Sequence, residues 1–570
     1  MEVAALLRDT RAKDTKFIVV TGGVCSSLGK GVLVAALGVL LKNADYSVSV
    51  IKWDPYLNVD PGTMSPLVHG EVFVTSDGAE TDLDLGHYER HIGLRLMRDS
   101  SVTSGQIYQE VLDGEREGRY LGKNIQMIPH VVDAIKKRLL TFALNHDVKF
   151  VLVEIGGTVG DIEEGLFLEA LRQLRMDLGC QQVLYSHLSY VPFLSWTGEV
   201  KTKPTQHSVE KLKQSGLVPD CLFLRADREI DNQSLDKLSI MCGVMRERIF
   251  QMLTFEPVFR AFLDLDRQKV GERVREYFKL PSQTPADLSE WKSFIDQIDK
   301  SQQVVRIGLI AKYVGRNDPY ISVIDAIKAA GYHCGQKVKL EVIEAEALEK
   351  ADYNSDIPAW TQLKEMDGIV VPGGFDKRGI EGKILAARWA REHNVPYLGL
   401  CLGMQIMIIE AARNLLGLKE ANSAEFFPDG PHPVICMMEG QKSVMRKGAS
   451  MRLGSYPCTL VPGTKAHVAF DKDMVMERHR HRYEVNNAYR KDFERVGLVF
   501  SGMYEEKDLV EISEYKDHPY MLGSQFHPEF QSSPLQVHPL FRAFMEAVVQ
   551  EKLVHTDMHD SKTKNVYDGQ

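Results

Sequence analysis

A short apolar stretch that runs into a glycine-flanked cysteine constrains the fold of this chain more than any other feature. Residues 394–398 read Asn-Val-Pro-Tyr-Leu, and residues 399–405 read Gly-Leu-Cys-Leu-Gly-Met-Gln. The pattern predicts a buried strand, a tight turn with Cys401 at its apex, and a helix that begins immediately afterwards. Such an elbow exposes one side chain, and the helix N-terminus favours a thiolate and offers N–H groups to an oxyanion.

A histidine and a carboxylate that could serve this cysteine lie much further along the chain. Residues 525–529 read Gln-Phe-His-Pro-Glu. His527 could act as the base, and Glu529 could orient it, as in other Cys/His hydrolytic arrangements. A lone cysteine is usually a small buried hydrophobe. The flanking glycines together with His527 and Glu529 favour the catalytic interpretation of Cys401.

These motifs together resemble a class I glutamine amidotransferase domain. The resemblance rests on Pro-Gly-Gly-Phe at residues 372–375, on residues 399–405, and on His-Pro-Glu at residues 527–529. It implies that Cys401 is the nucleophile, His527 the general base and Glu529 its orienting partner. Domains of this family hydrolyse glutamine to glutamate and pass ammonia to a synthetase. Because some 300 residues precede this domain, we expect the synthetase to lie in the same chain.

Length and composition exclude several classes of protein. A chain of 570 residues is too long for one hydrophobic core, and 44% hydrophobic with 26% charged residues is typical of a soluble globular protein. The net charge of −9 argues against nucleic-acid binding. The sequence has no apolar run long enough for a membrane span and no signal-peptide pattern. Its scattered cysteines predict neither disulfides nor zinc, so we expect a cytoplasmic protein that binds neither nucleic acid nor membrane.

The order of apolar segments predicts two α/β domains. β-Branched runs at residues 17–20, 48–51 and 150–154 alternate with helical segments, which indicates a P-loop-type, doubly wound parallel sheet. A second sheet is expected to begin at residues 306–311. The predicted parts are an N-terminal extension (1–14), a first domain (15–280), a linker (281–303), the amidotransferase domain (304–554) and a polar, disordered tail (555–570).

A glycine-rich turn in the first domain has the features of a phosphate-binding loop. Residues 21–31 read Thr-Gly-Gly-Val-Cys-Ser-Ser-Leu-Gly-Lys-Gly and join a predicted strand to a predicted helix. Glycines let the backbone surround a phosphate, the helix dipole favours the anion, and Lys30 adds a positive charge. The turn departs from the strict P-loop pattern because its first glycine is too far from Gly29. Gly31 also stands where a Ser or Thr usually binds Mg²⁺.

Without that hydroxyl, a magnesium ion needs carboxylates from elsewhere in the chain. Asp82 and Asp84 lie in an alternating polar/apolar segment, and Glu154 ends a buried strand. Acids at the carboxyl ends of parallel strands lie where ligands bind, and Mg²⁺ typically takes one or two carboxylates plus phosphates. We interpret Asp84 and Glu154 as metal ligands, and Asp82 as a solvated or structural carboxylate.

The densest basic stretch leaves two interpretations open. Residues 199–207 read Glu-Val-Lys-Thr-Lys-Pro-Thr-Gln-His. The two lysines and the hydroxyl groups could clamp a second phosphate chain, whereas composition alone favours a solvated loop.

The first half of the chain resembles the synthetase domain of the CTP synthase family. The matching blocks are residues 52–56, 58–66, 69–74, 156–163 and 201–206, and the resemblance covers about residues 16–550 in the family's domain order. It implies an ATP-dependent amination of UTP to CTP by ammonia from glutamine, through a 4-phosphorylated UTP. It further implies Mg²⁺ with ATP, GTP as allosteric activator, CTP as feedback inhibitor, and a homotetramer.

The resemblance also implies a set of site residues. Lys30 would contact the phosphates and Lys52 would assist transfer. The ATP set is Ser27, Leu28, Gly29, Lys30, Gly31, Val32 and Asp84; the Mg²⁺ set is Asp84 and Glu154. The UTP/CTP set is Ser26, Asp161, Ile162, Glu163, Lys201, Thr202, Lys203, Pro204, Thr205, Gln206 and Lys237. The glutamine set is Gly374, Leu402, Gly403, Met404, Gln405, Glu425 and Arg482; the GTP lid is Arg378, Gly379 and Glu381.

Some positions depart from the family pattern. Asp376 stands where the family usually has glycine, and Trp53 occupies a usually aliphatic position. Residues 243–256 fit poorly, and the segment between residues 436 and 451 is short. Two rival functions remain: another P-loop glutamine-dependent amidoligase, or a catalytically silent, filament-forming paralogue. His479 and His481, taken without the resemblance, would suggest a metal site.

Overall fold

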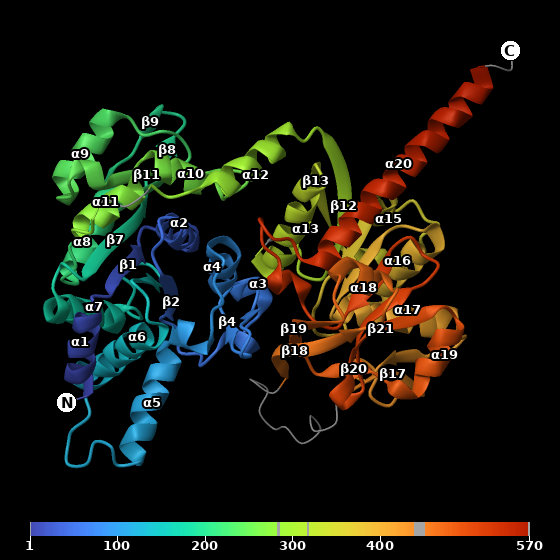
Figure 1. Ribbon diagram of the computed structural model, residues 1–570, viewed down its shortest axis with the longest axis horizontal. Helices are drawn as coiled ribbons and strands as arrows, with labels where there is room; N and C mark the ends of the chain where they lie inside the picture. The colour runs from blue at the N-terminus through green and yellow to red at the C-terminus, as the bar shows by residue number, and fades with distance from the viewer. Residues whose placement is uncertain (1, 282–284, 316–317, 438–450, 568–570) are drawn as a thin grey trace. The chain divides into compact units, whose positions relative to one another are not determined.

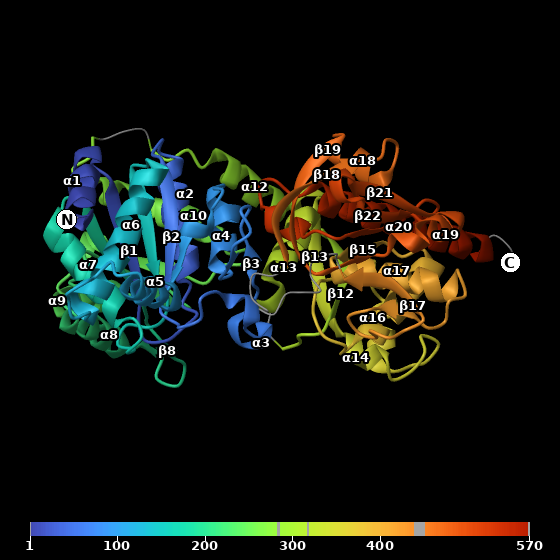
Figure 2. The ribbon, with the colours of Figure 1, turned by 90° about the horizontal axis from the view of Figure 1, so that it is seen from below.

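The computed structural model describes residues 2–281, 285–315, 318–437 and 451–567, with side chains up to residue 554. The chain forms two compact units, Met1–Pro61 with Asp84–Ile295, and Gly62–Leu83 with Asp296–Gln570. In both units helices cover the faces of a central sheet (Figures 1 and 2). The prediction of α/β folds that begin with a parallel sheet is confirmed.

The first unit is built on a seven-stranded, wholly parallel sheet in the order β11-β10-β7-β1-β6-β2-β5. Its inner strands are buried on both faces, as expected of apolar runs in a parallel sheet. The strands are β1 (Lys16–Gly22), β2 (Val48–Asp54), β5 (Ser101–Thr103), β6 (Phe150–Ile155), β7 (Val183–Tyr190), β10 (Cys221–Ala226) and β11 (Ile249–Leu253), with a hairpin of β8 (Phe193–Leu194) and β9 (Glu199–Val200).

The helices of this unit pack on the sheet through apolar faces. The expected N-terminal extension forms α1 (Glu2–Lys13), which places Val3, Leu6 and Leu7 against the core. The others are α2 (Lys30–Lys42), α4 (Asp84–Ile92), α5 (Ser104–Arg116), α6 (Val132–His146), α7 (Gly165–Leu178), α8 (Lys203–Gln214), α9 (Asn232–Cys242), α10 (Arg260–Arg267) and α11 (Val270–Tyr277). Trp53 is fully buried and stacks on Phe167 with ring centroids 5.2 Å apart, so the core accommodates this departure. Residues 243–256 include the edge strand β11.

The second unit contains a nine-stranded mixed sheet in the order β13-β12-β14-β15-β23-β22-β21-β18-β19. The strands from β13 to β23 pair in parallel, and those from β23 to β19 pair antiparallel. Their bounds are β12 (Gln303–Ala311), β13 (Gln336–Glu344), β14 (Gly368–Val371), β15 (Tyr397–Leu400), β18 (Arg452–Leu460), β19 (Met474–His481), β21 (Leu498–Tyr504), β22 (Leu509–Tyr515) and β23 (Met521–Ser524). A smaller sheet holds β16 (Ala421–Ser423), β17 (His432–Met437) and β20 (Tyr483–Val485).

The helices of the second unit cover both faces of this sheet (Figure 2). They are α13 (Ile321–His333), α14 (Ala345–Leu348), α15 (Pro358–Lys364), α16 (Ile380–His393), α17 (Leu402–Asn414), α18 (Lys465–Phe470), α19 (Arg490–Arg495) and α20 (Pro539–Tyr567). Between the units in sequence lies α12 (Ser289–Lys300), inside which the division falls. Among the described residues, none of the helices is long and apolar enough to cross a membrane.

A segment from early in the sequence belongs to the second unit. Residues 62–83 include α3 (Pro66–His69) and the strand pair β3 (Phe73–Val74) and β4 (Glu80–Thr81). The backbone N–H of Ser455 donates to the Ser76 carbonyl at 2.9 Å, and that of Glu71 donates to the Asp318 carbonyl at 3.0 Å. No local pattern predicts that this segment belongs to the second unit, because its contacts join residues hundreds of positions apart.

The last helix of the chain begins before the predicted tail. Helix α20 continues to Tyr567 without an internal glycine or proline, and its first half buries Leu540, Phe541 and Phe544. Once the start of a helix is fixed by packing, each further turn forms at little cost. Residues 282–284 of the predicted linker and residues 438–450 of the short segment lie outside the described residues.

Candidate active sites

The predicted elbow forms at the end of β15, with a strained backbone at its apex. Cys401 has φ 51° and ψ −98°, and α17 begins at Leu402. A Cβ on Gly403 would lie 2.0 Å from the Val371 carbonyl oxygen, and one on Gly399 would lie 2.6 Å from the Gly403 backbone. Only glycine fits at either position, so the flanking glycines let the helix start directly beneath the thiol.

The histidine and the carboxylate meet the cysteine in the same cavity. His527 Nδ1 lies 2.7 Å from Glu529 Oε1, and His527 lines a pocket with Cys401. Burial lowers the pKa of His527, but the charges of Glu529 and Cys401 outweigh this effect and raise the pKa to about 10. These neighbours thus favour the protonated form of the imidazole. Its ring stacks on Phe530, with centroids 5.0 Å apart.

A cavity of ≈ 330 Å³ opens beside the thiol. Of the predicted glutamine set, Gly374, Leu402, Gln405, Glu425 and Arg482 line it, whereas Gly403 and Met404 lie in the buried first turn of α17. Residues outside the predicted glutamine set also line it: Gly62, Thr63, Phe375, Met451, His481 and Tyr483. Gln405 is fixed by donating from Nε2 to the Tyr483 carbonyl at 3.0 Å.

The charges around this cavity suit a zwitterionic amino acid. Burial raises the pKa of Glu425, and the charges of Lys312 and Arg482 act in the opposite direction. A carboxylate and a guanidinium in one small cavity can receive an ammonium group and a carboxylate from the same ligand.

The loop at residues 372–376 lies over the thiol. It ends at Asp376, where the family usually has glycine. Lys312 Nζ donates to the Phe375 carbonyl at 3.1 Å and to the Asp376 carbonyl. Asp376 has φ 77°, so it adopts the left-handed conformation that glycine takes more easily. Its carboxylate accepts from the Lys377 backbone N–H at 2.6 Å, which stabilises this conformation locally.

The residues predicted for the GTP lid follow this loop. Arg378 donates to the Lys312 carbonyl at 2.7 Å and pairs with Glu346 at 3.2 Å. Gly379 has φ 70°, and Glu381 pairs with Arg413 at 2.6 Å. In the sequence the three residues lead from the loop into the first turn of α16.

The phosphate loop of the first unit has the expected strand-turn-helix form. Gly29 has φ 91°, and Val24 and Ser27 also have positive φ. Lys30 begins α2 and donates from Nζ to the Gly157 carbonyl at 2.5 Å. Ser26 and Ser27 are exposed, whereas Leu28 is buried and Val32 is half-buried. Burial lowers the pKa of Lys30, and the charges of Glu154 and Asp84 oppose this effect.

The structure brings the two predicted metal ligands to Lys52. Its Nζ donates to Glu154 Oε1 at 2.8 Å and to the Asp84 carboxylate, and the Tyr88 hydroxyl also bonds Glu154. A Cβ on Gly31 would lie 2.2 Å from Asp84 Oδ1. The departure at Gly31 is thereby explained, because the Asp84 carboxylate occupies the space of the usual Ser or Thr side chain. Asp82 lies in the second unit, 3.4 Å from His69 Nε2.

The predicted UTP/CTP residues lie on several elements of the first unit. Residues 203–206 form the start of α8, where Thr205 is buried and Gln206 donates to the Thr202 hydroxyl at 3.0 Å. Lys201 pairs with Glu199 at 2.5 Å, and Lys237 is exposed on α9. Asp161 accepts from the Thr158 N–H at 3.2 Å, and Ile162 and Glu163 are exposed.

Several buried groups near these sites were not predicted from the sequence. Burial raises the pKa of Glu164, next to the predicted CTP turn, to about 7. His187 contacts Thr21 and Ser208, and burial lowers its pKa to about 3. Tyr88 could have been found, because it follows Asp84 by one helical turn. No local sequence pattern indicates that Lys312 and Lys383 are buried near the glutaminase site.

In the suspected metal pair, His479 contacts a carboxylate and His481 the Tyr483 carbonyl. His479 Nε2 lies 2.6 Å from Glu511 Oε2, and Arg452 also pairs with Glu511. Within the described ranges, His, Cys, Asp and Glu side chains form no group of three that could hold a metal ion by themselves. Asp84 and Glu154 would need phosphate oxygens to complete a magnesium site.

Comparisons with known proteins identify both halves of the chain. Residues 16–280 match the family described as CTP synthase N-terminus, and residues 317–547 match glutamine amidotransferase class-I. The CTP synthase of Caldanaerobacter subterraneus subsp. tengcongensis is 50% identical over 94% of this chain and 99% of its own length. That of Chloroflexus aurantiacus is 51% identical over 95% and 97%. The glutaminase domain of Trypanosoma brucei CTPS, solved with bound acivicin, is 35% identical, with 43% and 94% coverage and a TM-score of 0.39.

Proposed function

The chain belongs to the CTP synthase family and is a glutamine-hydrolysing carbon–nitrogen ligase, and from this premise we propose how its residues divide the work. Residues 15–280 act as the synthetase domain that binds ATP and UTP, and residues 304–554 as the amidotransferase domain. The observation that carries the proposal is the assembly of a complete set of reactive groups in each unit. Lys30, Lys52, Asp84 and Glu154 lie together in the first unit. Cys401, His527 and Glu529 lie together in the second.

In the second unit, Cys401 attacks the side-chain amide of glutamine. Glu425 takes the ammonium group of the substrate and Arg482 its carboxylate, since both side chains line the cavity. Backbone N–H groups near Gly374 and Leu402 stabilise the oxyanion, and the His527 imidazolium donates its proton to the leaving nitrogen. Ammonia leaves, a thioester to Cys401 remains, and water hydrolyses it to glutamate while His527 takes up a proton.

In the first unit, the ATP γ-phosphoryl group moves to O4 of UTP. The loop from Ser27 to Val32 holds the phosphates, and Lys30 and Lys52 balance the charge of the transferring group. Asp84 and Glu154 suit Mg²⁺, which would neutralise phosphate charge when it is bound with ATP. Ammonia then attacks C4 of the phosphorylated UTP, and phosphate leaves to give CTP.

Regulation and assembly follow the family in this proposal. UTP binds through Ser26, Lys237 and residues 201–206, and CTP inhibits by contacting residues 161–163. GTP activates the glutaminase through the lid of Arg378, Gly379 and Glu381, because these residues follow the loop over the thiol and Arg378 contacts the Lys312 carbonyl. The protein assembles as a cytoplasmic homotetramer.

One assay separates this proposal from its rivals. Purified protein should form CTP from UTP and ATP with either glutamine or ammonium as the nitrogen source. Replacement of UTP by another carbonyl substrate should abolish the reaction, which excludes a different amidoligase. A folded protein that neither hydrolyses glutamine nor forms CTP would instead support the silent, filament-forming paralogue.

A further inference from the structure

A lysine side chain lies completely buried below the glutaminase loop. Lys383, on the first turns of α16, has no solvent-exposed surface. Its Nζ donates to the Pro372 carbonyl at 3.0 Å. Pro372 directly precedes Gly373 and Gly374, which line the pocket of the catalytic cysteine and histidine.

The burial of this amine needs an explanation, because an apolar side chain of similar length would fill the space more favourably. Taking a lysine amine out of water is unfavourable unless hydrogen bonds replace its hydration. Burial lowers the pKa of Lys383 well below its usual value, and the nearby charge of Lys312 lowers it further. Among the described residues, the Pro372 carbonyl is its one hydrogen-bond partner. Packing alone therefore does not account for a lysine at this position.

The loop that Lys383 contacts has to be placed accurately. A Cβ built on Gly373 would lie 3.7 Å from Cys401 Cβ and 3.2 Å from His527 Cε1. The backbone of Gly373 therefore passes close to both catalytic side chains, and movement of the loop away from them would withdraw its N–H groups from the oxyanion. The far end of the loop is held by Lys312 at the Phe375 carbonyl. Proline has no N–H, so the near end depends on its carbonyl for an anchor.

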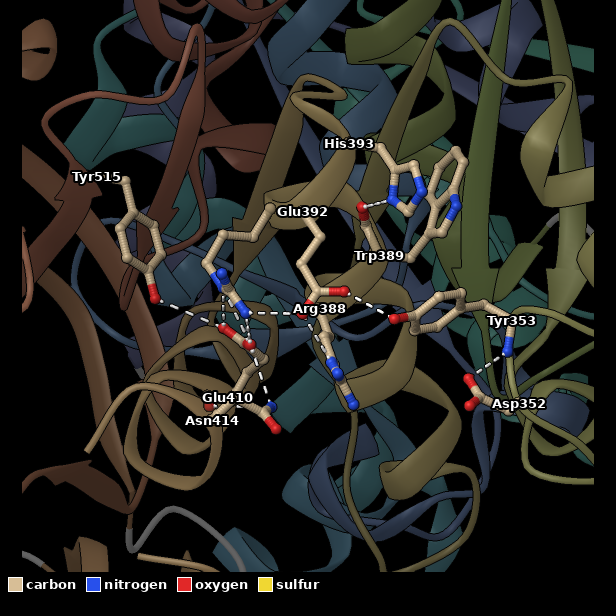
Figure 3. Close-up of polar contacts among 10 residues, drawn as sticks. Asp352, Tyr353, Arg388, Trp389, Glu392, His393, Glu410, Asn414 and Tyr515 are labelled. Atoms are coloured by element: carbon tan, nitrogen blue, oxygen red, sulfur yellow. Dashed lines mark hydrogen bonds and ion pairs between the residues drawn. The ribbon is translucent and has the colours of Figure 1, made fainter. Parts of the chain in front are cut away.

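The helix that carries Lys383 is joined to the elbow helix by an ion pair to the buried carboxylate of Glu410 (Figure 3). Arg391 on α16 donates to Glu410 on α17 at 2.8 Å, and Glu410 is fully buried. Asn414 and Tyr515 also bond Glu410, at 3.1 and 3.5 Å. The helix that follows the nucleophile and the helix of Lys383 are therefore held together.

We propose that Lys383 is a positioning residue of the glutaminase reaction, which holds the Pro372 carbonyl so that the loop N–H groups face the oxyanion. The proposal rests on the proposed glutaminase function of Cys401. Lys383 contacts neither thiol nor substrate, and acts through the loop. By holding the loop, Lys383 stabilises the transition state more than the bound substrate, because the amide oxygen becomes negative only as the thiol attacks.

The test replaces Lys383 by methionine, which is apolar and of similar length. In K383M the kcat for glutamine hydrolysis should fall about 10-fold or more, since complete removal of one oxyanion donor costs about 10²-fold or more and K383M displaces the donors without removing them. The KM for glutamine should change less than about 3-fold, since the ammonium and carboxylate contacts remain. CTP formation with ammonium should be unchanged. The rate at which iodoacetamide alkylates Cys401, followed by mass spectrometry of its peptide, should also be unchanged, because that reaction needs no oxyanion site.

Lys465 provides a matched control in the same unit. Its Nζ donates to the carbonyls of Tyr515 and Lys516, both at 2.8 Å, and it lines neither pocket beside the thiol. K465M should keep the wild-type kcat. If K383M is insoluble, K383Q is expected to show the same loss of kcat with KM retained.

An unchanged kcat in folded K383M would overturn the inference, and so would equal losses in glutaminase and alkylation rates. A wild-type protein that does not hydrolyse glutamine would overturn the proposed function itself.

Discussion

The phosphate loop and the cysteine elbow have the same local architecture: a buried parallel strand turns through glycines into a helix N-terminus. They differ in how closely the turn is packed. At the elbow, backbone atoms of Val371 and Gly403 pack against the flanking glycines, and strain is concentrated at Cys401. In the phosphate loop, residues 24–27 are exposed, and positive φ angles are spread over Val24, Ser27 and Gly29. A nucleophile that forms a covalent bond needs one fixed position. A loop that surrounds a phosphate chain can close on its ligand.

The charged groups of the two sites also differ in how permanent their pairing is. Lys52 joins the carboxylates of Asp84 and Glu154 in the first unit, so cations and anions there neutralise one another without the nucleotide. In the second unit, Glu529 and Cys401 act together on one imidazole. The first site is arranged to exchange partners when ligands arrive, whereas the second keeps its partners throughout.

The largest expected effect concerns Lys30. In Lys30→Ala, CTP formation should fall about 10²-fold or more with both glutamine and ammonium, because neither nitrogen source replaces phosphoryl transfer. Glutamine hydrolysis itself should persist. Lys42→Ala, at the last turn of the same helix, is the control and should keep synthesis. Near-normal ammonium-dependent turnover in Lys30→Ala would make Lys30 a structural residue.

The next effect tests why glycine follows Lys30. In Gly31→Ser, the new side chain would meet Asp84 Oδ1, so ammonium-dependent synthesis should fall about 10-fold while glutaminase activity is kept. Gly31→Ala should lose a similar amount, because the clash begins at Cβ. Equal or higher activity of Gly31→Ser would show that the loop accepts a hydroxyl ligand and that Asp84 moves aside.

A smaller effect is expected at the loop over the thiol. Asp376→Gly should raise basal glutaminase activity a few-fold and reduce its dependence on GTP, because glycine adopts the observed positive φ without strain. Asp376→Asn separates charge from conformation, since asparagine also tolerates this region. Lower basal hydrolysis with an unchanged GTP response in Asp376→Gly would show that the aspartate supports the loop.

The smallest effect is one of stability with pH. The folded pKa of His527, about 10, exceeds the unfolded value of 6.5. Its stabilising contribution is therefore complete below pH 6.5 and declines as pH rises toward 10. Glu529→Gln removes the charge that contributes most to raising the pKa of His527. The melting temperature of this variant should therefore lie a few degrees below that of the wild type at pH 6, and the difference should shrink by pH 10. Thermal melts at both pH values test this, and a constant difference would contradict it.

The two sites also differ in what could be predicted from their sequences. The elbow and the phosphate loop were predicted because each is a local pattern of apolar run, glycine and reactive residue. Gly62 and Thr63 in the glutaminase cavity were missed, because nothing local shows that residues 62–83 pack in the other unit. Lys383 was missed for a related reason: a lysine in a helix is usually solvated, and only tertiary packing shows that this one is buried.

The measurement that tests the division of labour most directly is CTP formation by Cys401→Ala with each nitrogen source. The account predicts that glutamine-dependent synthesis is abolished, because no other residue replaces the thiol. Ammonium-dependent synthesis should stay close to wild type, because Lys30, Lys52, Asp84 and Glu154 lie in the other unit. A folded variant that loses both activities, or keeps glutamine-dependent synthesis, would contradict the assignment of one half-reaction to each unit.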